Sequence, residues 1–140
     1  MDNQRATFLL KSQFLENIVD LIIDGDFDQP LIDGELFLDC LERMINLEHL
    51  SISCNSIRKG EFLQKLEQLK SLRMSMNCMN IESIKLPKQL TCLDVEECGI
   101  NVDRASTISQ LEQLRYLNVS NNEIGIEGMR LISKMKNLET

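Results

Sequence analysis

His49 and Cys54 are the side chains whose types and spacing come nearest to a nucleophile and its general base. Such a pair works only in hydrogen-bond contact, with a third group that orients the base. A strand over this region would point His49 out from a sheet and leave Cys54 in the following turn. The sequence offers neither a third orienting group nor an oxyanion site, so we expect no catalytic residue here.

The cysteines and one acidic run are the remaining candidates for chemistry. Five cysteines, at positions 40, 54, 78, 92 and 98, are an odd number with no C-x-x-C pair. This disfavours a zinc site and a disulfide framework, and favours reduced thiols. The run DGDFD lacks the ligand spacing and closing Glu of an EF-hand, which favours a solvated loop. We therefore predict no metal and no cofactor.

An internal repeat defines the elements that must position these side chains. LRYLNVSNNEI, which begins at Leu114, has apolar residues at positions 1, 4, 6 and 11 and asparagine at position 9. Three earlier copies begin at Leu47, Leu69 and Leu90. A faint copy begins at Ile18, and a truncated copy begins at Leu138. A period of 20 to 29 residues with Asn or Cys at position 9 is the signature of leucine-rich repeats. The chain resembles that family.

The resemblance implies an α/β fold, a curved leucine-rich-repeat solenoid with a parallel β-sheet on its concave face and helices and turns on its convex face. NEIGIEGM resembles the ribonuclease-inhibitor-like subclass, and LPKQLTCLDVEECGI the shorter repeats of bacterial effectors. We expect residues 1–17 to form an N-terminal helical cap. Residues 18–140 would form the repeat domain, with about five repeats, the last truncated.

The residue pattern supports this fold independently. Alternation such as Leu117 with Val119 suits a short strand buried on one face. A polar side chain at position 9 can bond the backbone groups of the sharp turn that follows. This predicts a structural turn ladder of Asn55, Asn77, Cys98 and Asn122.

Between the predicted strands the apolar spacing becomes helical. EFLQKLEQL follows Gly60 in this pattern, and EGMRLISKMKNL places Met129, Ile132 and Met135 on one face. Asp103 is the expected N-cap of a helix that buries Ile108 and Leu111. A longer segment has the apolar face Leu36, Phe37, Cys40, Leu41 and Met44. Pro87 predicts a turn or extended segment in place of a helix, because proline lacks a backbone donor.

Charge limits the classes of partner. Residues 1–46 contain ten acidic and three basic side chains and residues 47–140 contain twelve of each, so the net charge of −7 lies at the N-terminal end. This disfavours nucleic acid and anionic membranes as ligands. No apolar run is long enough to span a bilayer, and the first residues lack the pattern of a secretory signal. We expect a cytoplasmic protein, with an effector secreted into a host cytosol as the alternative.

The third, fifth and seventh positions of each frame should project from the concave sheet. The predicted partner-binding residues there are His49, Ser51, Arg73, Ser75, Asp94, Glu96, Tyr116 and Asn118. Arg and Tyr most often anchor interfaces, and Asp94 and Glu96 would steer a basic partner. The expected function is non-catalytic recognition of a protein or peptide.

Three alternatives stay open. The chain is a structural segment of a larger solenoid, or, as the resemblance allows, it recruits substrates for a ubiquitin ligase or acts as a secreted effector. No F-box or ligase motif supports the last two. The C-terminal KNLET lacks a polar cap, which predicts either a longer solenoid or self-association through this end.

Overall fold

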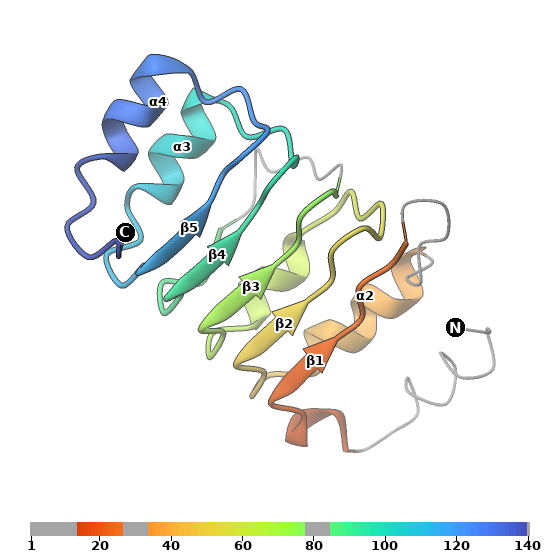
Figure 1. The fold of residues 1–140 in the computed structure, drawn as a ribbon. Coiled ribbons are helices and arrows are strands. Elements are labelled where there is room, and N and C mark those ends of the chain that lie inside the picture. The colour runs from red at the N-terminus through yellow and green to blue at the C-terminus, as the bar shows by residue number, and fades with distance from the viewer. Residues whose placement is uncertain (1–13, 27–33, 78–84, 140) are drawn as a thin grey trace.

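The computed structural model describes residues 14–26, 34–77 and 85–139. In these residues five short parallel strands form one sheet in sequence order. The strands are β1 (Asp20–Ile22), β2 (His49–Ser51), β3 (Ser71–Arg73), β4 (Cys92–Asp94) and β5 (Tyr116–Asn118). Helical segments lie along one face of the sheet and leave the other face open (Figure 1). The predicted α/β leucine-rich-repeat solenoid is confirmed, and we call the uncovered surface the open face.

The helical side consists of short elements. They are η1 (Leu15–Asn17), α2 (Gly34–Glu42), η2 (Glu61–Lys65), α3 (Val102–Ile108) and α4 (Gly125–Ile132). Between β3 and β4, residues 85–91 contain turns and no helix, as Pro87 predicts. Most of the predicted cap, residues 1–17, lies outside the described residues. Its last part forms η1, where Leu15 is buried.

The core lies between the sheet and the helical side. The central residues of the strands stand in register, and Leu50, Leu72 and Leu93 are at most 2% exposed. Full burial of each such side chain stabilises the fold by roughly 1.5–3 kcal/mol. The repeated leucine frame therefore forms one continuous core through the stacked repeats.

Asn77 shows how the turn ladder joins neighbouring repeats. Its Oδ1 accepts hydrogen bonds from the backbone N–H groups of Asn55 at 3.1 Å and Ile57 at 3.0 Å. Its Nδ2 donates to the carbonyls of Ile52 and Met74 at 2.9 and 2.8 Å. One buried amide thus bonds the turn of the preceding repeat and its own, as the sequence predicts.

Asn122 repeats this arrangement, and Cys98 changes it. Asn122 Oδ1 accepts from the N–H groups of Cys98 and Ile100, and its Nδ2 donates to the carbonyl of Val95. The Cys98 thiol donates to the Met74 carbonyl at 3.1 Å and the Glu96 carbonyl at 3.4 Å. A thiol has one weak donor where an amide has two strong ones, so this rung is held less tightly.

Several helix predictions need correction. Asn101 is the N-cap of α3 in place of Asp103, because its side chain accepts the backbone N–H of Arg104 at 3.1 Å. EFLQK forms the 3-10 helix η2, not an α-helix. Helix α4 begins at Gly125, before the predicted start, and Met129 is 53% exposed.

The remaining apolar faces agree with the prediction. Ile108 and Leu111 are buried, as are four residues of the longer segment: Phe37, Cys40, Leu41 and Met44. The side chain of Leu36 lies outside the described ones.

Candidate functional site

The open face is built from parallel rows of side chains that cross the five strands. Strand register aligns two rows of side chains. The first row is Asp20, His49, Ser71, Cys92 and Tyr116. The second row is Ile22, Ser51, Arg73, Asp94 and Asn118. Ser75 and Glu96 follow just after β3 and β4. The structure therefore brings all eight predicted partner-binding residues to one face of the sheet, where Ser51 is buried and the other seven are partly or fully exposed. Whether they bind a partner stays a prediction.

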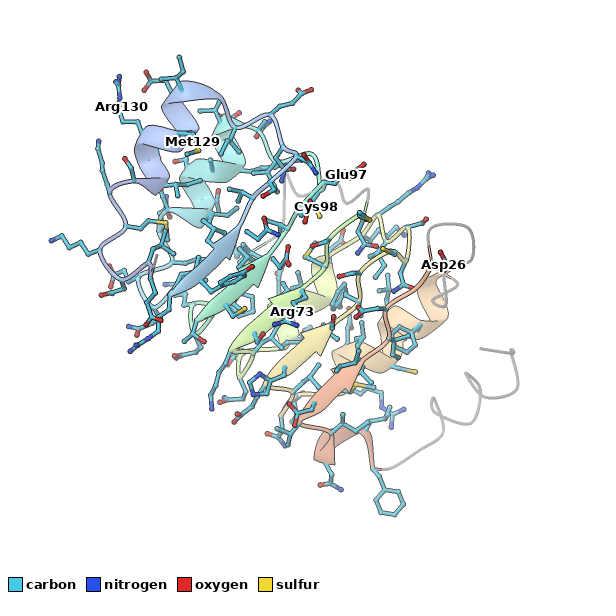
Figure 2. All side chains as sticks on the ribbon, viewed as in Figure 1. Asp26, Arg73, Glu97, Cys98, Met129 and Arg130 are labelled. Carbon is cyan, nitrogen blue, oxygen red and sulfur yellow. The ribbon has the colours of Figure 1, made fainter. Side chains whose placement is uncertain are left out.

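Arg73 lies at the centre of this surface. It is exposed on the middle strand, between Ser51 and Asp94 in its row, and projects from the sheet in Figure 2. Within residues 14–26, 34–77 and 85–139, the guanidinium takes part in no ion pair or hydrogen bond. Five N–H donors in a fixed planar arrangement are thus available to an acceptor.

Carboxylates on either side of Arg73 are held in place by neighbouring repeats. Asp94 accepts the Ser75 hydroxyl at 2.6 Å. Asp24 accepts the Ser51 hydroxyl at 2.7 Å and the Ser53 N–H at 2.8 Å. Ser51 is only 9% exposed, and its hydroxyl already serves Asp24. The two serines therefore orient carboxylates, and in the first pair Asp24 is exposed whereas Ser51 is buried.

Glu96 is fixed on the other side of β4. Its Oε2 accepts from Asn118 Nδ2 at 3.2 Å, and its Oε1 from Asn121 Nδ2 at 3.0 Å. Asn121 is absent from the predicted binding set because it follows the strand at position 8 of the frame. The bond to Glu96 depends on stacking of repeats, and the spacing of a single repeat gives no signal for it.

Two exposed apolar side chains border the polar centre. Tyr116 on β5 is 51% exposed, and Ile22 on β1 is 77% exposed. Ile22 is also missing from the predicted set, although it occupies the same row as Arg73. Among the described residues, the open face thus combines the unpaired Arg73 guanidinium, several fixed carboxylates and an exposed apolar side chain at each end.

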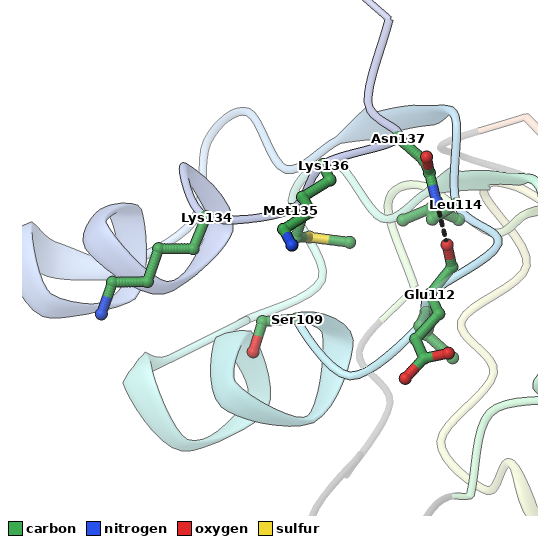
Figure 3. Close-up of a pocket in the computed structure, with 8 residues that line it drawn as sticks. Ser109, Glu112, Leu114, Lys134, Met135, Lys136 and Asn137 are labelled. Atoms are coloured by element: carbon green, nitrogen blue, oxygen red, sulfur yellow. Dashed lines mark hydrogen bonds between the residues drawn. The ribbon is translucent and has the colours of Figure 1, made fainter.

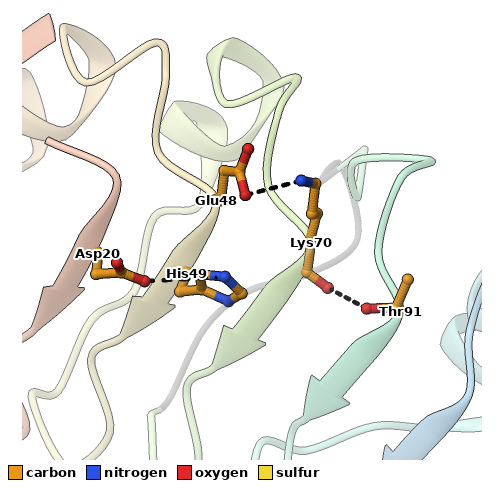
Figure 4. Close-up of polar contacts among 5 residues, drawn as sticks. All are labelled: Asp20, Glu48, His49, Lys70 and Thr91. Atoms are coloured by element: carbon orange, nitrogen blue, oxygen red, sulfur yellow. Dashed lines mark hydrogen bonds and ion pairs between the residues drawn. The ribbon is translucent and has the colours of Figure 1, made fainter. Parts of the chain in front are cut away.

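Ion pairs line the edge where the strands begin. Lys70 Nζ lies 2.7 Å from Glu48 Oε2, and this hydrogen bond lowers the pKa of the Glu48 carboxyl (Figure 4). His49 Nε2 lies 3.8 Å from Asp20 Oδ1. These exposed pairs contribute at most modestly to stability and give the rim alternating charge.

The structure keeps His49 apart from the thiol of Cys54. The imidazole faces Asp20 on β1, whereas Cys54 Sγ lies 3.5 Å from Met76 Sδ in the turns after the strands. Burial raises the pKa of the Cys54 thiol, and the charges of Asp24, Asp26 and Glu97 raise it further. A protonated thiol is a poor nucleophile at neutral pH. Nothing in this geometry forms a nucleophile and base.

In the part of the chain that the structure describes, no group of three or more His, Cys, Asp or Glu side chains converges to hold a metal ion. None of the helices described is long and apolar enough to cross a membrane.

A pocket of about 370 Å³ lies at the C-terminal ends of α3 and α4 (Figure 3). Lys134 and Lys136 are among its lining residues, and Asn137 Nδ2 donates to the Glu112 carbonyl at 2.7 Å beside it. The carbonyl ends of two helices oppose binding of an anion by these lysines. We assign no ligand to this pocket.

One family match and the fold of one solved structure, the tropomodulin domain below, support the leucine-rich-repeat fold. Residues 112–133, which span β5 and α4, match the family described as leucine-rich repeat. No curated protein sequence matches the chain. Among solved structures, the tropomodulin C-terminal domain of Caenorhabditis elegans is 13% identical, covers 93% of this chain and 90% of its own, and gives a TM-score of 0.65. An internalin of Listeria monocytogenes is 20% identical, covers 72% of this chain and 24% of its own, and gives a TM-score of 0.37.

Proposed function

We propose that this chain, which is a leucine-rich-repeat protein, is a non-catalytic module that binds a protein or peptide on the open face of its sheet. The observation that carries the proposal is the exposed Arg73 guanidinium at the centre of a surface whose carboxylates are already fixed. Arg and Tyr are the residue types most often found as binding anchors. Tyr116 lies two strands from Arg73, a lateral distance of about 10 Å.

The fixed carboxylates favour binding because little side-chain entropy remains to be lost. Asp24, Asp94 and Glu96 are each held by hydroxyl or amide donors from adjacent repeats. Side chains ordered before binding avoid a cost of roughly 0.5–1.5 kcal/mol each. Preorganisation of this kind supports recognition of a partner that brings matching charges.

The charges define the chemistry of that partner. Three fixed carboxylates suit lysine or arginine side chains, whereas Arg73 suits one carboxylate or a run of backbone carbonyls. We therefore propose a basic protein or peptide segment that carries one acceptor group at its centre. The same charge distribution argues against nucleic acid and anionic membranes as ligands, and we propose a cytoplasmic location.

The size of the face sets a limit on affinity. Five strands about 4.8 Å apart, each with about 10 Å of exposed length, offer about 250 Å² in projection. A standard interface needs about 800 Å² from each partner. Rim residues such as Asn121 and the Glu48–Lys70 pair must therefore contribute, or binding will be weak and transient.

Selection from a random peptide library tests the proposal. The wild type should enrich basic peptides that carry one central carboxylate, and Arg73→Glu should lower their affinity at least tenfold, which equals about 1.4 kcal/mol, because it repels that carboxylate. Lys65→Glu makes the same charge reversal on η2, on the helical side, and should leave affinity unchanged. Asp94→Arg should shift selection towards acidic peptides. Equal binding by wild type and Arg73→Glu would move the site away from the open face.

A further inference from the structure

A third row of side chains crosses the open face just beyond the ends of the strands. Backbone bonds continue the strand register there. The Gly25 N–H donates to the Ser53 carbonyl at 2.8 Å, and equivalent bonds join each later pair of neighbouring repeats. The row that this register aligns is Asp24, Ser53, Ser75, Glu96 and Ser120. Two carboxylates therefore stand in one row, with two serines between them.

Both carboxylates of this row are held in place and keep capacity for a partner. Glu96 accepts one amide hydrogen bond at each oxygen. Asp24 accepts the Ser51 hydroxyl and the Ser53 N–H. A carboxylate can accept about four hydrogen bonds, so a cationic group of the partner can still bind to each. Asp24 is exposed and Glu96 is half-buried, which leaves both within reach of a partner.

Arg73 lies between these two carboxylates and gives the face an alternating charge. Asp24 and Glu96 are three strands apart, a lateral distance of about 14 Å. Arg73, labelled in Figure 2, is in the adjacent row on β3, one strand from Glu96 and two from Asp24. The serines in the middle of the third row have small side chains, which allow a bound backbone to approach the sheet closely. A matching segment must therefore present positive, negative and positive groups in that order.

The distance between the carboxylates selects the conformation of such a segment. In an extended chain, side chains four residues apart project from one face and are about 13–14 Å apart. The side chain two residues along lies midway between them on the same face. In an α-helix, side chains on one face recur after about seven or eleven residues, at about 10.5 Å or about 16.5 Å. An extended segment that crosses the strands therefore fits the three charges better than a helix does.

We propose that the open face binds an extended peptide segment that crosses its strands, with a basic residue, any residue, an acidic residue, any residue and a basic residue in succession. The two basic side chains bind Asp24 and Glu96, and the acidic side chain between them binds Arg73. This inference rests on the proposed function, and it adds the spacing of the partner's charges and the orientation of its chain. Net charge alone would favour any basic peptide, whereas this arrangement favours one spacing.

Exposed apolar side chains beside both carboxylates suit the stems of long basic side chains. Ile22, which is 77% exposed, lies two residues before Asp24 on the same face. Tyr116, which is 51% exposed, lies two residues before Asn118, whose amide donates to Glu96. Lysine and arginine place their aliphatic stems on apolar surface and keep their charged ends at an acceptor. The surroundings of the two carboxylates thus favour a long basic side chain at each end of the segment over a free cation.

Two synthetic peptides of equal composition and equal net charge test the spacing. One contains Lys-Ser-Glu-Ser-Lys between short glycine and serine ends, and the other contains Lys-Lys-Ser-Glu-Ser between the same ends. Binding of each to the full chain is measured by titration in nuclear magnetic resonance spectra. The first peptide should bind at least about tenfold tighter, because only its lysines reach both carboxylates.

Variants of the two carboxylates locate the bound lysines. Asp24→Asn and Glu96→Gln each remove one charge and keep an oxygen acceptor, so both should fold, and circular dichroism melting verifies this. Each should lower the preference for the first peptide to about threefold or less, because one lysine loses its charged partner. Glu61→Gln makes the same change at an exposed residue of η2, on the helical side, and should leave the preference unchanged.

Three results would overturn the inference. Equal affinity for the two peptides, lost in Arg73→Glu, would overturn it and leave the proposed function standing. A preference that persists in both carboxylate variants would place the bound lysines elsewhere. A wild type that binds neither peptide would also exclude this pattern, and the proposed function would fail with it only if the random library enriched no peptide either.

Discussion

At the scale of single residues, the side-chain amide of asparagine at position 9 of the repeat bonds backbone N–H and C=O groups where the chain leaves the sheet. These groups no longer have a neighbouring strand to pair with. We predict that Asn122→Ala lowers the free energy of unfolding by about 1–3 kcal/mol, because it removes the partner of two N–H groups and of the Val95 carbonyl. Asn77→Ala should cost more, since Asn77 is 0% exposed and water cannot replace its bonds. Urea unfolding measures both. Gln68→Ala, an exposed amide change, should have no effect, and a similarly small effect for Asn77 would show that its bonds are dispensable.

The same turns contain a feature that residue types do not reveal. Position 8 of the frame has a left-handed backbone in four successive repeats, with φ between 52° and 57°, yet it is occupied by Cys54, Met76, Glu97 and Asn121. Glycine is the residue that normally indicates this conformation. None of these four is glycine and only Asn121 is of a type that often adopts this conformation, so we attribute the backbone of these turns to the position 9 bonds.

At the scale of elements, the close packing of α4 on α3 depends on Gly128. We predict that Gly128→Leu lowers the free energy of unfolding by about 1–3 kcal/mol, because a side chain there meets the Cβ atoms of Ala105 and Ile124 at 3.1 Å. Higher helix propensity returns only about 0.8–1 kcal/mol. Thermal melting should show the loss, and Glu127→Leu on the exposed side of the same helix should not. A melting temperature that rises in Gly128→Leu would mean that the two helices can move apart without cost.

The sequence correctly predicts which helical residues are buried, because apolar spacing determines burial. It does not predict which of two nearby capping residues begins a helix, or whether a short segment forms an α-helix or a 3-10 helix. Ile108 and Leu111 are buried as the spacing requires. The N-cap of α3 is different, because Asn101 and Asp103 are both good capping residues and only the path of the chain from the preceding turn selects Asn101. EFLQK has helical spacing, but it forms only the 3-10 turn η2 between two strands.

At the scale of the whole molecule, the repeat frame is enough to place the predicted site but does not reveal its internal bonds. Position 5 of each frame correctly aligns Ser51, Arg73 and Asp94 across three strands. The bonds from Ser51 to Asp24 and from Ser75 to Asp94 join residues 27 and 19 positions apart. They run in opposite directions along the solenoid, so no rule within one repeat could foresee them. What makes these carboxylates rigid is stacking, a property of the assembled sheet.

A solenoid in which each repeat contacts only its neighbours should also unfold unevenly. Amide hydrogen exchange should be slowest at Leu72 and Met74, buried between repeats on both sides, and much faster at Leu117 and Val119, whose N–H groups lie on the sheet edge. Uniform protection would mean that the repeats open as one cooperative unit.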